Sequence, residues 1–333
     1  MKKIVWGIIG CGNVTEVKSG PAFNRIENSS LRAVTRRTPG KARDYAKRHN
    51  VPKWYDDAGK LLQDPEINAV YIATPPDSHA KYAVMAAEAG KHIYVEKPMA
   101  LNHAECLQMM EAAQRKNVSL FVAYYRRCLP SFLKVKQWLD TGAIGMPRCV
   151  NIRLFKPVHQ LQPGQPTPWR FLPEISGGGL LVDLGSHQLD YLDYIFGPIH
   201  SIQSFAANQA GLYPAEDIVS ASFIFKNGVL GTASWCFSAA KECRTDQIEI
   251  LGSEGRIAFS TFDFSPIQLE SSTASETLEF PKPAHVQEHF IGRVVEQLTG
   301  GRPCPGTGTS AARTNKVMDH ILAGYKRESK ELS

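Results

Sequence analysis

The sequence predicts an α/β domain with a doubly wound parallel sheet of the Rossmann type, followed by an α+β domain with a large, mostly antiparallel open sheet. Up to about residue 125, short apolar segments alternate with helical patterns, and a glycine turn joins the first segment to the first helix. Beyond that point, longer segments of alternating polarity flank turn residues. A chain of 333 residues has room for two domains of ordinary size, which we place at 1–125 and 126–333.

In the first domain the apolar segments are short and continuous, as expected of strands that helices cover on both faces. The expected strands are Ile4–Ile9, Leu31–Thr35, Ala69–Ala73, His92–Val95 and Ser119–Ala123. The expected helices are Val14–Ile26, Gly40–His49, Ser78–Ala89 and His103–Asn117. Asn102 is the expected N-cap of the last helix, with Glu105 in the capping-box position. Gly90 is the expected residue after the end of the third helix.

The second domain begins with a helical pattern and continues mainly as strands. The expected helices are Ser131–Thr141, which ends at Gly142, then Leu180–Phe196, Val286–Leu298 and Thr309–Lys326. The expected strand Arg148–Phe155 precedes a loop rich in Pro and Gln, Pro157–Pro168. Two hairpins are expected: Val219–Phe225 with Val229–Phe237 around Asn227-Gly228, and Gln247–Leu251 with Arg256–Thr261 around Gly252–Gly255.

Composition excludes several classes of protein. A hydrophobic content of 43% and a charged content of 21% are ordinary for a water-soluble enzyme. The net charge of +6 is too small to indicate nucleic-acid binding, and no apolar stretch is long enough to span a bilayer. The seven cysteines are scattered without a C-x-x-C pair, and no cleavage region follows Met1-Lys2-Lys3. We therefore expect a cytoplasmic protein with no disulfide framework, no metal, no nucleic-acid partner and no membrane partner.

The glycine turn carries the first functional signal. It consists of Gly10, Cys11, Gly12, Asn13 and Val14, between the first strand and the first helix. Gly10 allows a tight turn, Gly12 lets the backbone approach a pyrophosphate, and the helix N-terminus offers N–H groups. The third glycine position of the dinucleotide fingerprint holds Thr15. In this strand–turn–helix context the motif predicts a dinucleotide site.

The end of the second strand indicates which dinucleotide binds. An NAD site normally has an acidic residue there to hold the ribose hydroxyls. This chain has no acid between Leu31 and Arg43, and its strand ends Thr35-Arg36-Arg37. Guanidinium groups suit a 2′-phosphate because they combine charge with paired donors. We therefore expect NADP(H) to be preferred, with NAD(H) still accepted; the alternative is that both arginines are solvated loop charges.

Two further motifs carry groups suited to proton transfer. Glu96-Lys97-Pro98 follows a strand at the carboxyl edge of the sheet, where Pro98 restricts Lys97 to an extended backbone. A lysine there is suited to proton chemistry or to polarising a substrate oxygen, although an isolated Lys-Pro is typical of a turn. Asp183 and His187 follow the run Gly177–Gly179 with helical spacing of four, the pattern of a general base and its orienting carboxylate or of a surface pair.

These motifs occur in a characteristic order along nearly the whole chain. The G-x-G turn comes first, then Thr74-Pro75-Pro76-Asp77-Ser78-His79, Glu96-Lys97-Pro98, and the glycine run that ends at Asp190. Together they resemble the glucose–fructose oxidoreductase, inositol dehydrogenase and rhizopine-catabolism family, called Gfo/Idh/MocA. The resemblance implies a catalytic set of Lys97, Asp183 and His187. It implies a cofactor lined by Gly10, Cys11, Gly12, Asn13, Val14, Thr35, Arg36, Arg37, Thr74, Pro75, His79, Glu96 and Lys97.

The resemblance also concerns two pairs of residues, Trp169-Arg170 and Tyr125-Arg126. Trp169-Arg170 is similar to a pair that touches NADP in anhydrofructose-reductase-like members. Many relatives carry Asn where this chain has Tyr125 before Arg126, so the expected substrate contacts of Tyr125 and Arg126, beside that of His187, depart from the family pattern.

One motif competes with this interpretation. His285-Val286-Gln287-Glu288-His289 spells the H-x-x-E-H of inverted zinc proteases, but no third ligand is apparent in the sequence. The resemblance instead implies that His285 lines the active cleft.

The sequence therefore predicts an NADP(H)-dependent oxidoreductase that transfers hydride to or from a sugar, a polyol or a related hydroxy or keto compound. Two alternatives stay open: an NAD(P)-assisted glycosidase of the same fold, and a non-catalytic regulator that senses NADP and sugar. Small or apolar residues at outward positions of Val219–Phe225 and Val229–Phe237, together with the family's habit, predict a homodimer or homotetramer through the C-terminal sheet.

Overall fold

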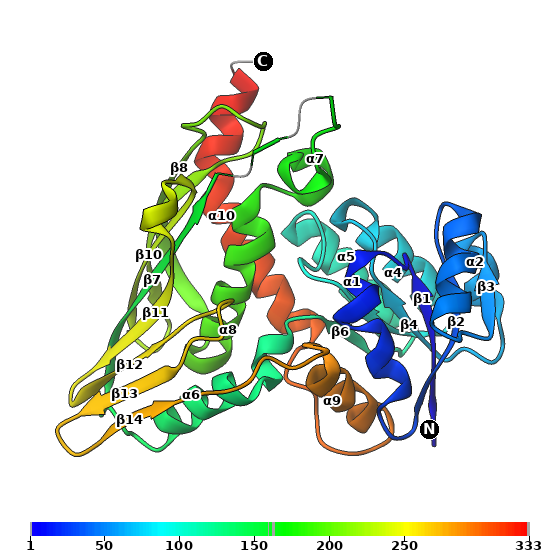
Figure 1. The fold of residues 1–333 in the computed structure, drawn as a ribbon, viewed down its shortest axis with the longest axis horizontal. Helices are drawn as coiled ribbons and strands as arrows, with labels where there is room; N and C mark the ends of the chain where they lie inside the picture. The colour runs from blue at the N-terminus through cyan, green and yellow to red at the C-terminus, as the bar shows by residue number, and fades with distance from the viewer. Residues whose placement is uncertain (1, 159, 162–163, 332–333) are drawn as a thin grey trace. The chain divides into compact units, whose positions relative to one another are not determined.

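The computed structural model describes residues 2–158, 160–161 and 164–331, which form two compact units (Figure 1). The first unit comprises Met1–Leu129 and Pro283–Ala312, and the second comprises Pro130–Lys282 and Arg313–Ser333. The expected boundary after residue 125 lies close to Leu129, whereas Pro283–Ala312 returns to the first unit. The expected loop Pro157–Pro168 includes residues 159 and 162–163, which lie outside the described part of the chain.

The first unit contains the doubly wound parallel sheet that the sequence predicts. Its strands are β1 (Ile4–Ile9), β2 (Ser29–Thr35), β3 (Lys53–Tyr55), β4 (Ala69–Ile72), β5 (His92–Val95) and β6 (Leu120–Val122). Their order is β3-β2-β1-β4-β5-β6, and all five pairings are parallel. This order is that of dinucleotide-binding domains. Edge strand β3 is three residues long, too short for its polarity pattern to predict it.

The helical segments of this unit follow the expected order. They are α1 (Asn13–Val17), η1 (Gly20–Asn24), α2 (Pro39–Arg48), α3 (Ala58–Gln63), η2 (Pro76–Ser78), α4 (His79–Glu88), α5 (His103–Arg115), η3 (Tyr125–Cys128) and α9 (Glu288–Leu298). Asn102 caps α5 as predicted, because its side chain accepts a 3.0 Å hydrogen bond from the Glu105 N–H. Gly90 has a φ of +69° after α4, as predicted for that position.

The prediction of one long helix from Val14 to Ile26 is wrong. The structure has the short helices α1 and η1 instead, because Pro21 lacks an N–H and its ring clashes with a preceding helical turn. Gly20 lets the chain pass close to α2: a Cβ there would lie 2.2 Å from both the Thr15 carbonyl oxygen and the Tyr45 hydroxyl. That hydroxyl donates a 2.9 Å hydrogen bond to the same carbonyl, which joins α1 to α2.

The two faces of the parallel sheet are covered by different elements. Val70 and Ile72 of β4 pack into the aliphatic core formed with α3, α4 and α5. Tyr71 points to the opposite face and stacks on Tyr94 of β5 with ring centroids 4.9 Å apart. Phe290 of α9 stacks on Tyr94 in turn, at 5.8 Å. The segment Pro283–Ala312 therefore belongs to the first unit because α9 covers its aromatic face.

The second unit contains the large sheet. Its strands are β7 (Pro147–Pro157), β8 (Ile199–Ala207), β9 (Ile218–Phe225), β10 (Leu230–Ala239), β11 (Thr245–Gly252), β12 (Gly255–Phe259), β13 (Ile267–Ser271) and β14 (Ser275–Leu278). The order is β14-β13-β12-β11-β7-β10-β9-β8, antiparallel except for the pair of β7 with β10. Both predicted hairpins are present; β8, β13 and β14 lie outside the predicted strands.

The helical segments of this unit are α6 (Pro130–Asp140), η4 (Trp169–Phe171), α7 (Pro173–Ser176), the π-helical turn η5 (Leu181–Gly185), α8 (Ser186–Phe196) and η6 (Lys241–Cys243). Among them, α6 and α8 lie along one face of its sheet (Figure 1). The last helix, α10 (Gly308–Glu331), contributes its first five residues to the first unit and the rest to the second. No described helix is long and apolar enough to cross a membrane.

The predicted helix Leu180–Phe196 is interrupted by the π-helical turn η5, a feature often found at functional sites. The following helix α8 is buried from Ser186 to Asp193. Within it, Gln188 accepts a 2.7 Å hydrogen bond from the Trp235 indole and donates one of 3.0 Å to the Thr261 hydroxyl. These two bonds hold α8 against the sheet and against the loop after β12.

Candidate functional site

The glycine turn joins the ends of three strands. Gly10 has a φ of +93°, and a Cβ on it would lie 2.7 Å from Cγ2 of Thr74, so only glycine fits. The N–H groups of Gly10 and Cys11 both donate to the Thr35 carbonyl, at 2.9 and 3.2 Å. The carboxyl ends of β1, β2 and β4 are therefore held together at the edge where open α/β sheets bind ligands.

Gly12 is a glycine for a different reason. Its φ of −129° is accessible to any residue, and a Cβ there would find only the Gly10 carbonyl oxygen, at 3.9 Å. The protein itself therefore leaves room for a side chain at this position. Because Gly12 has no side chain, its backbone is open to close approach by a ligand such as a pyrophosphate. The residues present thus fit a dinucleotide.

Two residues at the glycine turn, Thr15 and Cys11, are fully buried. Thr15, in the third glycine position, is fully buried and donates its hydroxyl to the Gly12 carbonyl at 2.8 Å. Cys11 is also fully buried, and burial raises the pKa of its thiol to about 11, so the thiol stays neutral. Both side chains serve the packing of the loop.

The two arginines after β2 differ in their surroundings. Arg36 is half-buried, and its Nη1 donates a 3.1 Å hydrogen bond to the Cys11 carbonyl of the glycine turn. Arg37 is exposed at the start of α2, whose first turn contains no acidic residue. Arg36 therefore supports the loop, whereas Arg37 faces solvent.

An ion-pair cluster connects the glycine turn's helix to α2. Glu16 of α1 accepts hydrogen bonds from Arg48 at 2.8 Å and pairs with the His49 ring at 2.7 Å. Arg48 also pairs with Asp44 at 2.7 Å. The hydrogen bonds from Arg48 and then His49 lower the pKa of Glu16 to about 2. A charged Glu16 therefore fixes α1 on α2 at neutral pH.

The turns after β4 and β5 are linked through His79. This residue is fully buried, with Nε2 2.8 Å from the Thr74 carbonyl oxygen and Nδ1 3.0 Å from that of Pro98. Burial lowers the pKa of His79, which favours the neutral ring, and a neutral ring donates its single N–H to one of these two carbonyls. Thr74 also accepts a 2.8 Å hydrogen bond from Ser78. The Lys97-Pro98 peptide bond is cis.

The side chain of Glu96 is buried in the first unit. Its buried carboxylate accepts hydrogen bonds from the Tyr71 hydroxyl, from Gln287 at 2.6 Å and from the Lys97 N–H at 3.2 Å. Tyr94 donates to the other end of the Gln287 amide at 2.8 Å. Gln287 lies almost 200 residues away in sequence, inside the H-x-x-E-H motif, and nothing local in the sequence marks it. It is the site residue that sequence reasoning missed.

The first residues after β6 are packed inside the first unit. The Arg126 guanidinium lies 5.0 Å from the centre of the Tyr125 ring, and both residues are buried. Arg127 donates a 2.8 Å hydrogen bond to the Pro305 carbonyl. The structure therefore places Tyr125 and Arg126 in a buried turn, and their substrate contacts stay a prediction.

The second unit holds the other candidate residues. Arg170 pairs with Asp183 at 3.2 Å, and its guanidinium lies 4.4 Å from the Trp169 ring. His187 is buried at the start of α8, and its ring meets that of Phe262 edge-on at 6.0 Å. Arg170 thus contacts both Trp169 and Asp183, and His187 lies one turn further along the same helical segment as Asp183.

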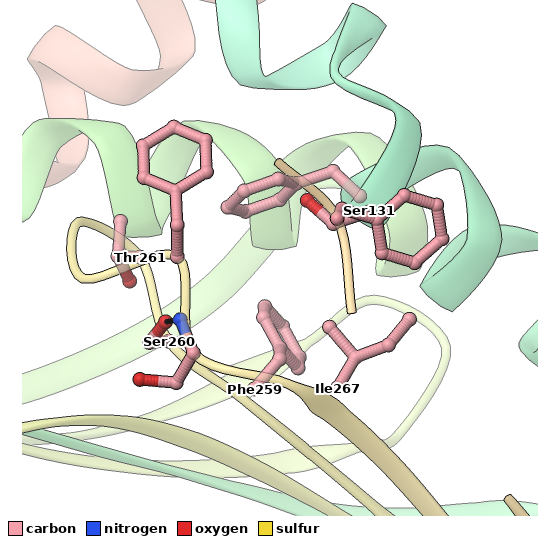
Figure 2. Close-up of a pocket in the computed structure, with 9 residues that line it drawn as sticks. Ser131, Phe259, Ser260, Thr261 and Ile267 are labelled. Atoms are coloured by element: carbon pink, nitrogen blue, oxygen red, sulfur yellow. Dashed lines mark hydrogen bonds between the residues drawn. The ribbon is translucent and has the colours of Figure 1, made fainter. Parts of the chain in front are cut away.

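Two further features involve other residues: a recess in the second unit, and the His285–His289 motif. A recess in the second unit is lined by Ser131, Phe132, Phe259, Ser260, Thr261, Phe264, Ser265, Ile267 and Phe280 (Figure 2), none of them a candidate site residue. The His285 ring lies 2.6 Å from the Val17 carbonyl oxygen, and Glu288 pairs with Arg25 at 3.2 Å. The described residues contain no group of three or more side chains able to hold a metal ion.

Comparison with known proteins agrees with this geometry. The first unit is that of an oxidoreductase: residues 4–124 match the oxidoreductase family with an NAD-binding Rossmann fold. Residues 132–258 match the GFO/IDH/MocA C-terminal domain. The chain belongs to the Gfo/Idh/MocA oxidoreductase family.

Similar proteins support the assignment. Oxidoreductase P35 of Formosa agariphila is 41% identical over 318 residues, which cover 95% of this chain and 98% of that protein. The levoglucosan dehydrogenase of Pseudarthrobacter phenanthrenivorans is 30% identical over 253 residues, covering 69% and 64%. An oxidoreductase structure from Thermotoga maritima superposes with a TM-score of 0.83 at 26% identity over 96% of both chains. A levoglucosan dehydrogenase in complex with NADH and levoglucosan has the same fold, with a TM-score of 0.87 at 23% identity over 98% of both chains.

The Glu16 cluster generates a pH prediction. Because the folded protein lowers the pKa of Glu16 to about 2, from an ordinary value of 4.5, the pairing stabilises the fold above pH 4.5. That stabilisation is lost as the pH falls towards 2. We expect Glu16→Gln to lower the urea midpoint at pH 6, and the difference from wild type to shrink steadily as the pH is lowered to 3. Glu27→Gln, at an exposed site, is the control. A difference that stays constant with pH would contradict the assignment.

Proposed function

We propose that this protein is an NADP(H)-dependent oxidoreductase that transfers hydride to or from a sugar, a polyol or a related hydroxy or keto compound. The observation that carries the cofactor part is the open space at Gly12, since no contact within the protein requires glycine there. The relatives named levoglucosan dehydrogenase and myo-inositol 2-dehydrogenase support the substrate class; the latter, from Thermotoga maritima, is 28% identical over 75% of this chain and 73% of its own.

The two glycines of the turn make a matched pair of variants. Gly12→Ala should leave the thermal stability of the protein unchanged and weaken NADPH binding by at least tenfold, because the new methyl group meets only the ligand. Gly10→Ala should instead lower the melting temperature, because its Cβ collides with Thr74 and its φ is positive. Thermal melting and NADPH fluorescence titration of both variants measure these effects. Unchanged NADPH affinity in Gly12→Ala would refute a dinucleotide at this turn.

The preference for NADP(H) rests on the arginines after β2. Arg37 is exposed beside an α2 N-terminus whose first turn has no acidic residue, a suitable setting for a 2′-phosphate. Arg36 is hydrogen-bonded to the glycine turn and so supports the binding of either dinucleotide. The two arginines therefore have separable roles in this proposal.

The single variants separate those roles. Arg37→Ala should weaken NADPH binding by about 1.5–3 kcal/mol and leave NADH binding unchanged, since only NADPH carries the extra phosphate. Arg36→Ala should weaken both, because it removes the support of the loop. Fluorescence titration with each cofactor makes the comparison, and Arg43→Ala, an exposed site on α2, is the control. Equal losses of NADH and NADPH in Arg37→Ala would overturn the preference.

The catalytic set that we propose is Lys97, Asp183 and His187. A bound nicotinamide dinucleotide supplies the hydride donor or acceptor. Oxidation of a hydroxyl also releases a proton, which the imidazole of His187 takes up and, in the reverse direction, returns. Lys97 donates a hydrogen bond from its ammonium group to the reacting substrate oxygen. Asp183, with Arg170 as its partner at 3.2 Å, orients the helical segment that carries His187.

Removal of the proton acceptor tests this set. His187→Ala should lower kcat by roughly 10²–10⁴, the usual contribution of a general acid–base group, while NADPH affinity stays near wild type. His200→Ala, at an exposed histidine of β8, should keep wild-type kcat. Steady-state rates in both directions, with a panel of aldoses, inositols and anhydro-sugars, supply the measurement. A wild-type kcat in His187→Ala would transfer the proton role to Lys97.

We further propose that the chain assembles as a homodimer or homotetramer through the outer face of the large sheet. Phe205 is 85% exposed there, and Leu230 and Ile224 are also exposed. Neighbouring outward positions of β9 are the small residues Ser220 and Ser222. Exposed apolar side chains on the outward face of β8, β9 and β10 suit a second copy of the chain.

A further inference from the structure

A lysine occupies an inward position at the end of a core strand of the large sheet. Along β7, the side chains of Val150, Ile152 and Leu154 are buried on the inner face, and Lys156 is the next residue in that register. Lys156 is half-buried. An ammonium group that replaces an aliphatic side chain in this series requires a partner or a function.

The sheet is distorted at this lysine. Phe155 of β7 pairs with Cys236 of β10, but Pro157 pairs with Ala239, so two residues of β10 lie opposite Lys156 alone. On the other side, the ladder with β11 ends at the pair of Phe155 with Thr245. A bulge of this kind redirects a side chain and is common beside active sites.

An acidic side chain on the neighbouring strand is already engaged in hydrogen bonds. Asp246 of β11 pairs in register with Leu154. Its carboxylate accepts backbone hydrogen bonds from Thr261, Phe262 and Asp263, at 3.0, 2.5 and 3.0 Å. Among the described residues, none forms an ion pair with Lys156, and its ammonium group instead lies over the ring of Phe262.

Phe262 lies in the loop that is hydrogen-bonded to Asp246, and its ring is close to both Lys156 and the candidate catalytic residue His187. The Phe262 ring centre lies 5.8 Å from the ammonium nitrogen of Lys156 and 6.0 Å from the ring centre of His187. An aromatic ring between a cation and an acid–base group can support the apolar face of a sugar ring while the cation binds a charged substituent.

We propose that Lys156 and Phe262 select a substrate that carries an anionic group, a carboxylate or a phosphate ester, over the corresponding neutral sugar. This inference rests on the proposed function, because it assigns the substrate class at the His187 site. Lys156 pairs with the anion, and Phe262 supports the ring beside His187.

The experiment compares matched ligands on matched variants. Binding of glucuronate, galacturonate, gluconate and glucose 6-phosphate is measured by calorimetry on the full chain with NADP⁺ present, against glucose, galactose and sorbitol. We expect at least one anionic ligand to bind about tenfold or more tightly than its neutral counterpart. The carboxylate and phosphate arms distinguish the two sources of charge.

Variants of Lys156 and Phe262 then test which side chain causes the preference for anionic ligands. Lys156→Met should abolish the anion advantage while neutral ligands bind as before, and Lys156→Arg should keep most of it. Phe262→Leu should weaken anionic and neutral sugars alike. Lys282→Met is the matched control, since Lys282 lies 5.9 Å from the ring of Phe264 on the same loop and is exposed. Thermal melting of each variant verifies folding.

The outcomes are separable from those of the proposed function. No anion advantage in wild type, or an advantage that survives Lys156→Met, overturns this inference even if neutral polyols reduce NADP⁺. Conversely, an advantage that depends on Lys156 without any hydride transfer supports the anion site and refutes the oxidoreductase proposal.

Discussion

The first unit depends on one buried carboxylate. Glu96 lies inside the unit, where an unpaired charge would be strongly destabilising, so hydrogen-bond donors must surround it. The donors come from a tyrosine of β4, from the backbone of Lys97 and from Gln287 before α9. Because Gln287 is supplied by a distant segment, that one requirement fixes Pro283–Ala312 on the aromatic face of the sheet. It also sets the turn that holds Lys97.

At the carboxyl edge of the parallel sheet, hydrogen bonds to backbone carbonyls hold the turns in place. The Thr35 carbonyl accepts two N–H groups of the glycine turn, Arg36 returns a hydrogen bond to that turn, and His79 joins the two turns that follow. Each contact engages a backbone carbonyl, so the loop geometry does not depend on one pair of side chains. Backbone contacts of this kind restrict the loop to one geometry, which reduces the ordering cost of binding a ligand.

In the second unit, hydrogen-bonded polar groups position the residues near His187. Gln188 bridges Trp235 and Thr261, while the half-buried Asp246 accepts three N–H groups of the loop that carries Phe262. A buried amide such as Gln188 costs free energy unless its partners are present, and it therefore favours one arrangement of the loop. The ring of Phe262 takes its place beside His187 for that reason.

The sequence by itself determined the order of the elements, the parallel and antiparallel sheets, the capped helix at Asn102 and the glycine turn. These features follow from local polarity patterns and from the special backbone of glycine and proline, which act over a few residues. Only the tertiary structure decided that α9 belongs to the first unit, that Glu96 is buried, that Arg36 and Arg37 have different surroundings, and that Lys156 lies over the ring of Phe262. Each of these depends on which distant donors and acceptors meet in the folded chain. No local pattern in the sequence predicts the hydrogen bond between Gln287 and Glu96. The bond is needed because Glu96 is buried in the folded chain, and a buried carboxylate requires hydrogen-bond donors.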